Sequence, residues 1–241
     1  AIDTPDAPIT KELAENSGVK IIDYTGGNLF GDYIEKLSGK HFCVSFAHPW
    51  DADWCIRNAQ SIMWDNGAFS AYTKGKPFNK DGYIKWLDDK LYGANWAIIP
   101  DVIDGSVEDQ REYMSGWPYP KHLSAPVWHM HLSLDWLREI LDTYPRFCFG
   151  SSGEFWKVGN AAWSRRADDA WSIIEKSGAR PWVHMMRGLK LADKRWPFAS
   201  ADSTNVARNF KNKGREKCPK EMCERIDAIQ TPLTFTLELG R

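Results

Sequence analysis

Short apolar runs recur along the chain, and each is followed by polar residues and then, in most cases, by a segment with helical spacing. Seven runs, and an eighth candidate near the N-terminus, have the continuous apolar character that is typical of buried parallel strands. They are residues 20–25, 41–47, 61–64, 96–100, 125–130, 146–150, 180–186 and 197–201. We therefore expect strands and helices to alternate along the sequence.

Three of the intervening segments have apolar residues on one helical face. Residues 133–144 place Leu134, Leu137, Ile140 and Leu141 on one side, with Ser133 as the expected N-cap. Residues 165–178 repeat the pattern and end at Gly178, a residue type that favours helix termination. Residues 82–93 form the third predicted helix.

This alternation, in a chain of 241 residues, predicts a single (β/α)8 barrel of the TIM type that occupies residues 1–241. An open, doubly wound sheet is the second interpretation. It is weakened because no G-x-G-x-x-G motif follows the first predicted strand.

Several classes of protein are disfavoured by simple features of the sequence. No apolar run approaches the roughly 20 residues that a membrane span requires. The N-terminal residues contain neither a basic region nor an apolar core, so we expect no signal peptide. The five cysteines are scattered and odd in number, which favours reduced thiols and a cytoplasmic location.

The formal net charge of −1 conceals an uneven distribution of charge. Residues 187–225 contain eleven Lys or Arg and five acidic residues, so this segment carries +6 and the remainder −7. A basic C-terminal segment of this kind predicts a surface that contacts phosphates, although a solvated helix and loop would have the same composition. The 13 Trp are expected mainly in the core, with some available to stack on flat rings.

Carboxylates follow three of the predicted strands, at the positions where a barrel of this kind places its chemistry. They are Asp65, Asp101, Asp104 and Asp202. Paired carboxylates are typical of glycosyl transfer, in which one attacks the sugar carbon and the other moves the proton of the leaving group. Each Asp is also a common turn or N-cap residue, so a structural role is the alternative.

A metal site is a second interpretation of the same strand ends. His129 and His131 would point to one face of a strand, and His184 and Asp202 could complete a set of ligands for a metal-dependent barrel hydrolase. Histidines that are merely hydrogen-bonded in the core are the structural alternative. Separately, Cys218 and Cys223 form a C-x4-C pair that could supply half of a structural zinc site.

Five segments, in order, resemble motifs of the tRNA-guanine transglycosylase superfamily, which includes DNA 7-deazaguanine transglycosylases. Residues 63–70 (MWDNGAFS) are similar to its D-S-G-G-F-Q segment, and residues 99–104 (IPDVID) to its P-D segment. Residues 149–153 (FGSSG) stand where the family has Q-G-G, and residues 185–189 (MMRGL) where it has M-G-V-G. Residues 200–209 (SADSTNVARN) resemble its D-x-x-x-P-T-R-N-A-R stretch, and the likeness covers about residues 60–210.

The resemblance implies a role for each matching position. Asp202 would attack C1′ of a nucleotide and displace its base, and Asp65 would act as general acid and base. The base would be held by Asp101 or Asp104, by the loop residues Gly150, Ser151 and Gly153, and by stacking on Phe69, Tyr72 or a tryptophan. Flanking phosphates would be held by Arg187, Arg208 and Lys211. The family's zinc motif is not matched, so no cofactor is expected beyond a structural zinc.

These considerations lead to three hypotheses for function. The first is a transglycosylase that replaces guanine by a 7-deazaguanine derivative, in DNA rather than tRNA because the chain has no accessory RNA-binding domain. Its partners would be the nucleic acid, the free 7-deazaguanine base and, as in many barrels of this family, a second copy in a homodimer. The others are the metal-dependent hydrolase and a nucleic-acid-binding barrel without catalytic activity.

Overall fold

The computed structural model describes residues 21–23, 37–204, 206 and 219–236. Within these ranges all strands pair in parallel. Their bounds are β1 Ile21–Asp23, β2 His41–Ser45, β3 Ser61–Asp65, β4 Trp96–Ile98, β5 Ser124–Ala125, β6 Val127–His129, β7 Arg146–Gly150, β8 Trp182–Met185 and β9 Ser200–Ser203. The predicted strands therefore occur at all eight runs, with the fifth divided in two at Pro126.

The strands follow one another in the order β5-β4-β3-β2-β1-β9-β8-β7-β6. This order makes two parallel groups, β1 to β5 and β6 to β9, which meet where β1 pairs with β9. The mixed α/β class with a parallel sheet is therefore confirmed.

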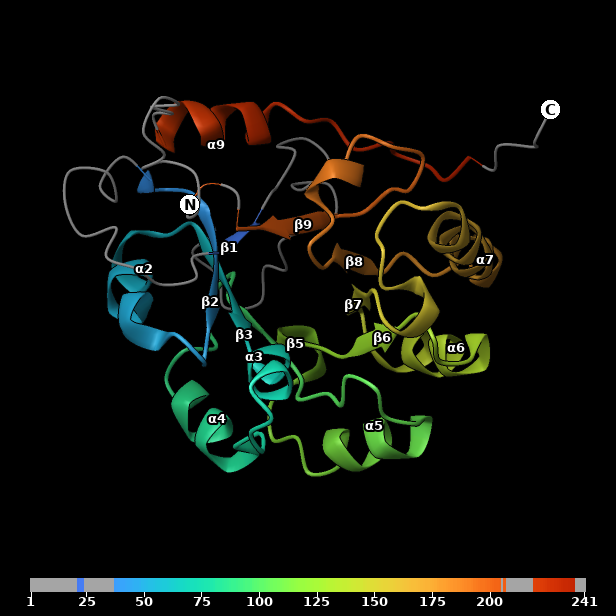
Figure 1. Ribbon diagram of the computed structural model, residues 1–241. Helices are drawn as coiled ribbons and strands as arrows, with labels where there is room; N and C mark the ends of the chain where they lie inside the picture. Colours follow the sequence, from blue (N-terminus) through green and yellow to red (C-terminus); the bar gives the residue numbers. More distant parts are fainter. Residues whose placement is uncertain (1–20, 24–36, 205, 207–218, 237–241) are drawn as a thin grey trace.

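Helices follow most of the strands and surround them (Figure 1). Their bounds are α2 Ala52–Asn58, α3 Ala68–Thr73, α4 Lys80–Leu87, α5 Val107–Met114, α6 Leu134–Thr143, α7 Ala161–Ser177 and α9 Pro219–Asp227. Among these described helices, none is both long enough and apolar enough to cross a membrane.

Local capping explains where several helices begin and end. The Ser133 hydroxyl accepts a hydrogen bond from Trp136 N–H at the start of α6, as its position in the sequence predicts. Ser106 and Asp109 form a reciprocal capping box at the start of α5. Gly178 ends α7 in the left-handed region, with φ of 70°, which confirms its predicted role.

Several boundaries of helices and strands differ from the predictions. Helix α7 begins at Ala161, four residues before the predicted start, because the Asn160 side chain caps it. Helix α4 begins at Lys80, where Asn79 caps it, and ends at Leu87 rather than near residue 93. The last strand begins at Ser200 rather than residue 197, and Phe198 N–H bonds to the Trp196 carbonyl within its own segment instead of to a neighbouring strand.

The two faces of the strands have different surroundings. Alternate side chains of β2 to β4 pack on α2, α4 and α9 in a first outer cluster, and those of β6 to β9 pack on α6 and α7 in a second. The opposite face forms an inner cluster that joins residues of six strands: Cys43, Met63, Trp96, Ile98, Ala125, Val127 and Cys148. This inner face leads, at the carboxyl ends of the strands, to the polar residues described next.

Candidate active site

Three carboxylates meet at the carboxyl ends of the strands. Asp65 is the last residue of β3, Asp101 follows β4 by three residues, and Asp202 lies on β9. Burial raises the pKa of Asp65 to about 6, and the negative charges of Asp101 and Asp202 contribute to this rise. Hydrogen bonds from Ser45 and from Gly67 N–H act in the opposite direction. Asp65 is therefore a carboxyl group that exchanges its proton close to neutral pH.

The turn after β3 holds Asp65 in place. Gly67 has φ of 75°, and a Cβ added there would meet atoms of Ala47 at 3.0 Å, so this position requires glycine. Its N–H donates to Oδ2 of Asp65 at 3.2 Å, while Oδ1 of Asn66 accepts from Ala68 N–H at 2.8 Å. Asp-Asn-Gly is thus a turn, as its composition suggests, and the turn also orients the carboxylate.

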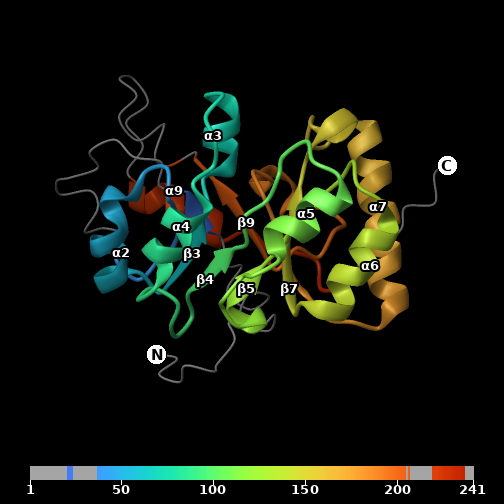
Figure 2. The same cartoon turned by 90° about the horizontal axis from the view of Figure 1, so that it is seen from below.

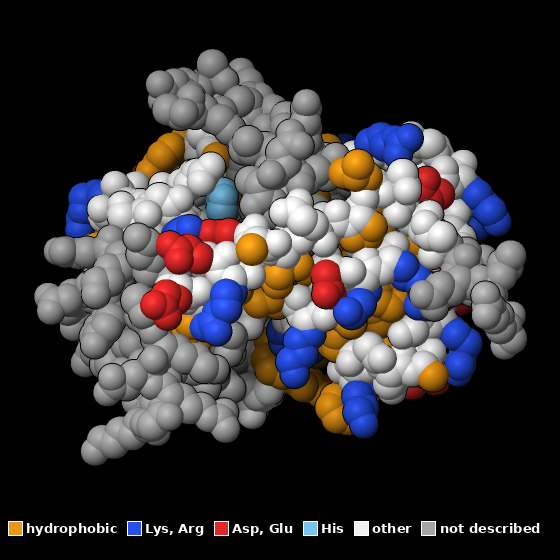
Figure 3. Space-filling view, turned by 90° about the horizontal axis from the view of Figure 1, so that it is seen from above, with side chains coloured by type: hydrophobic (Ala, Val, Ile, Leu, Met, Phe, Trp, Pro, Cys, Tyr) orange, Lys and Arg blue, Asp and Glu red, His pale blue; other side chains and the backbone are white. Residues whose placement is uncertain are grey.

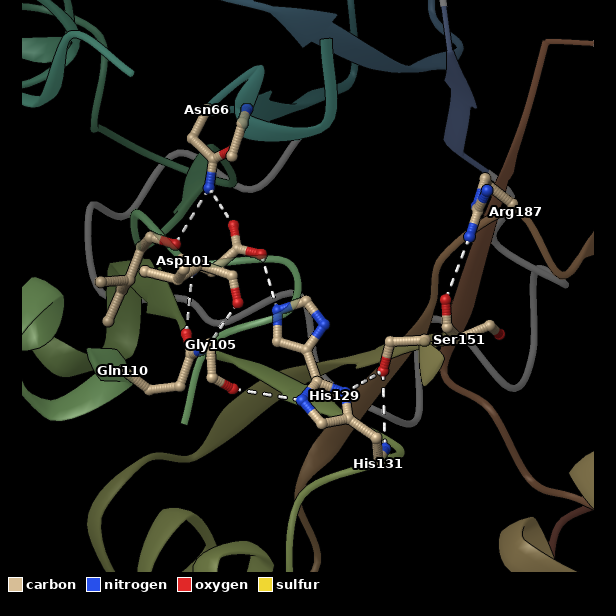
Figure 4. A network of polar contacts seen from close by, with 12 residues as sticks. Asn66, Asp101, Gly105, Gln110, His129, His131, Ser151 and Arg187 are labelled. Atoms are coloured by element: carbon tan, nitrogen blue, oxygen red, sulfur yellow. Dashed lines mark hydrogen bonds and ion pairs between the residues drawn. The ribbon is translucent and has the colours of Figure 1, made fainter. Parts of the chain in front are cut away.

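Asp101 is buried and both of its oxygens are occupied (Figure 4). Oδ1 accepts from Nδ2 of Asn66 at 2.7 Å, and Oδ2 lies 2.8 Å from Nε2 of His129, on β6. The same Asn66 amide also donates to the carbonyl of Ile99. Asp101 is therefore held by Asn66, which follows β3, and by His129 on β6. Nothing in the sequence pattern indicated Asn66 as its partner.

Among the described residues, the contacts of Asp202 are made through one of its oxygens. Its Oδ1 accepts from the backbone N–H of Arg187 at 2.6 Å and lies 3.4 Å from Nε2 of His184, which is fully buried on β8. Nδ1 of His184 is 2.8 Å from Oγ of Ser200, which also accepts from Nε1 of Trp182. No hydrogen bond to Oδ2 of Asp202 is formed by any residue that the structure describes. Among the described residues, therefore, the hydrogen bonding of Asp202 is confined to Oδ1.

Arg187 follows β8 and contacts Asp202 through its backbone N–H. It is the one described non-glycine residue with positive φ, at 57°, a conformation that costs energy in side chains other than glycine. Its guanidinium donates to the carbonyl of Ser151 at 3.2 Å and lies over the ring of Phe69, 5.0 Å from the ring centroid. The strained backbone of Arg187 therefore places its N–H against Asp202. Its side chain contacts both Ser151, which follows β7, and Phe69 on α3.

A pair of variants would separate the two roles of Arg187. Arg187→Gly and Arg187→Ala both remove the guanidinium, but only glycine adopts φ of 57° without strain. We expect Arg187→Gly to be more stable than Arg187→Ala by about 1 kcal/mol, as measured by urea unfolding. Equal stability of the two variants would show that the backbone conformation at this position is not strained.

The other residues that the sequence indicated lie around these three carboxylates or outside the described ranges. Asp104 is exposed and accepts a hydrogen bond from the Tyr72 hydroxyl. Gly150 ends β7 and its carbonyl accepts from Met130 N–H, whereas Gly153 is exposed and begins a short 3-10 helix. Oγ of Ser151 accepts from Nε1 of Trp163. Arg208, Lys211 and Cys218 lie outside the described residues, and Cys223 is buried in α9.

The histidines that suggested a metal site each have polar partners of their own. His129 pairs with Asp101, while His131 contacts Oγ of Ser152 through Nδ1 and the Gly105 carbonyl through Nε2 (Figure 4). Within the described ranges, no three His, Cys, Asp or Glu side chains are grouped as ligands of one metal ion.

The basic C-terminal segment is described only in part, because residues 205 and 207–218 lie outside the described ranges. On the face that Figure 3 shows, the described Lys and Arg side chains are interspersed with acidic and hydrophobic ones. Arg187 and Lys190 follow β8, and Arg195 forms an ion pair with Asp168 at 2.7 Å.

The sequence matches no known protein-family model, and no curated protein is significantly similar to it.

The raised pKa of Asp65 has a consequence for stability. Because its carboxyl holds a proton more tightly in the folded than in the unfolded chain, stability falls as pH rises from about 4 to 6 and stays lower above that range. Asp65→Asn removes this titration, so we expect a free energy of unfolding about 1–3 kcal/mol higher at pH 7.5.

Urea unfolding of the wild type and of Asp65→Asn, at pH 4 and at pH 7.5, measures this effect. The difference between the two proteins is expected to shrink at pH 4, where the carboxyl is protonated in the folded chain and, because this pH is close to the usual Asp pKa, about half protonated in the unfolded chain. A variant that is less stable than the wild type at pH 7.5 would contradict this expectation.

Proposed function

We propose that the strands close into an eight-stranded barrel, with β5 and β6 as one strand interrupted at Pro126. Ala125 pairs with β4 and Val127 with β7, and only Pro126 separates them in the chain. Proline interrupts a strand because it has no N–H to donate, yet its carbonyl accepts from Cys148 N–H at 2.8 Å. The inner cluster, which joins residues from β2 to β7, also supports closure, since a flat sheet would keep these side chains apart.

We further propose that the chain is a transglycosylase that replaces a guanine of DNA by a 7-deazaguanine base. The observation that carries this proposal is the difference between Asp65 and Asp202. Asp65 is a carboxyl group with a pKa raised to about 6, whereas Asp202 is fixed at Oδ1 by the Arg187 N–H and has no described donor at Oδ2. Two carboxyl groups with divided roles are what base displacement through a covalent intermediate requires. The motif resemblance adds nucleic acid as the substrate.

In the first step, Oδ2 of Asp202 attacks C1′ of the target nucleotide, and the bond from C1′ to the guanine N9 breaks. The proton on Asp65 passes to the departing guanine, so that Asp65 becomes a carboxylate. The Arg187 N–H keeps Oδ1 of Asp202 in position, which leaves Oδ2 for the attack on the sugar.

In the second step, the incoming base gives its N9 proton to Asp65 and attacks C1′. The bond between Asp202 and C1′ breaks, which restores both carboxyl groups to their starting states. We assign Asp101 the role of hydrogen-bonding the edge of the base. The base would then replace either Asn66 or His129, the two side chains that contact Asp101 in the free protein. The exposed ring of Phe69 would stack on the base.

Incubation with radiolabelled guanine tests the proposal. The protein is mixed separately with single-stranded DNA, duplex DNA and tRNA, and label retained in the nucleic acid is counted. We expect incorporation into DNA by the wild-type protein. Binding of nucleic acid with no incorporation and no base release would instead favour a binding protein without catalytic activity.

A further inference from the structure

Exposed aromatic side chains surround the candidate active site. Of the six most exposed large hydrophobic residues in the described part of the chain, four follow the carboxyl ends of strands: Trp50, Phe69, Tyr72 and Trp156. We call these four residues the aromatic rim. Eight of the 13 Trp are buried, so Trp50 and Trp156, with exposed fractions of 57% and 68%, do not serve as core residues. Large exposed rings on the segments that follow these strands are available to stack on a ligand.

The rim is linked to basic side chains on the side of β2 and α3. The ring of Trp50 contacts that of His48, with centroids 5.3 Å apart. Burial lowers the pKa of His48 and the charge of Lys74 lowers it further, so Lys74 lies close to this pair. Lys74 caps the end of α3, which carries both Phe69 and Tyr72. Figure 2 shows α3 standing out beyond the ends of the strands.

The rim continues across the carboxylates to the loop after β7. The Arg187 guanidinium covers one face of Phe69, and its backbone N–H holds Asp202. The same guanidinium bonds to the Ser151 carbonyl, and Trp156 and Lys157 lie a few residues further along that loop, both exposed. Aromatic rings and cations therefore both occur on the segments that follow β2, β3, β7 and β8, and the Arg187 backbone on one of these segments contacts Asp202.

We propose that the aromatic rim binds an unpaired stretch of DNA, with bases on both sides of the reacting nucleotide stacked on Trp50 and Trp156. A combination of rings and cations suits a single strand, because the rings stack on exposed base faces while the cations contact the phosphates. In a duplex these base faces are covered by their neighbours. The proposal rests on the proposed base exchange, and it specifies the form of DNA that the site accepts.

Binding of fluorescein-labelled DNA tests this inference without any turnover. Fluorescence anisotropy gives Kd for a single strand of about 15 nucleotides and for the same strand annealed to its complement. We expect the single strand to bind more tightly. Trp50→Ala and Trp156→Ala should each weaken its binding about tenfold or more. Lys74→Gln should reduce the dependence of log Kd on log salt by about 0.7.

Tyr92→Ala is the matched control. Tyr92 is exposed to 46% but precedes β4, at the opposite end of the strands, so its removal should leave Kd unchanged. Tighter binding of the duplex, tighter binding of RNA of the same sequence, or rim variants that bind as Tyr92→Ala does would each overturn the inference. If the wild type exchanges guanine but the rim variants bind DNA as tightly as the wild type, the inference about the aromatic rim fails and the proposed function stands. If DNA binding depends on the rim but no guanine is exchanged, the proposed function fails and the inference about binding stands.

Discussion

Replacing Asp202 by Asn is expected to reduce base exchange on the order of 10⁴-fold, because an amide oxygen does not form the bond to C1′. Asn has the shape of Asp, so its oxygen can still accept from the Arg187 N–H and the site keeps its geometry. The same substitution should abolish the covalent adduct between protein and DNA, detected as a band that migrates slowly after denaturation.

Asp135→Asn provides the control for this experiment. Asp135 is an exposed carboxylate on α6 that pairs with Arg138, so its replacement makes the same chemical change away from the site. It should exchange guanine as the wild type does. An Asp202→Asn protein that is folded and retains full exchange, with an adduct still formed, would refute the assignment of Asp202 as the nucleophile.

Asp65→Asn is expected to slow the release of guanine by about 10²- to 10⁴-fold, since it removes the group that protonates the leaving base. The pH dependence gives the sharper test. In the wild type the protonated fraction of Asp65 falls above pH 6, so the single-turnover rate of guanine release should decline through that region. In Asp65→Asn this decline should be absent.

The two expected effects of Asp65→Asn have opposite signs, which makes the variant informative. A residue that served only the fold would lose stability and activity together. Asp65→Asn should instead gain stability at pH 7.5, because burial disfavours the ionised carboxyl. It should lose activity, because the proposed reaction uses that carboxyl group. A variant that loses both would identify Asp65 as a structural residue.

Much of the fold could be predicted from local pattern. Continuous apolar runs identified the strands, and the capping residues Ser133 and Gly178 identified the ends of two helices. Helices α2 and α3 could not be predicted in this way, because each is under eight residues long and has too few turns to establish a periodicity. Two prolines lie within predicted apolar runs, and neither is part of a strand. Pro126 interrupts a strand between β5 and β6, and Pro197 precedes β9.

The candidate site was predictable only in outline. The sequence predicts Asp65, Asp101 and Asp202 directly after strands, and they lie at or close to strand ends, with Asp65 and Asp202 still within β3 and β9. Parallel strands bring these carboxyl ends to one edge. The partners that distinguish the three could not be predicted. The link from Asn66 to Asp101 depends on how two loops approach each other, and the backbone of Arg187 adopts a conformation that no sequence pattern indicates.

The division of the strands into two groups has a consequence for how the molecule opens. The first outer cluster packs β2, β3 and β4 on α2, α4 and α9, and the second packs β6 to β9 on α6 and α7. The inner cluster, helix α9 and the pairing of β1 with β9 join the two groups. Loss of these joining contacts would separate Asp65 and Asp101 from Asp202, while most of each outer cluster stayed packed.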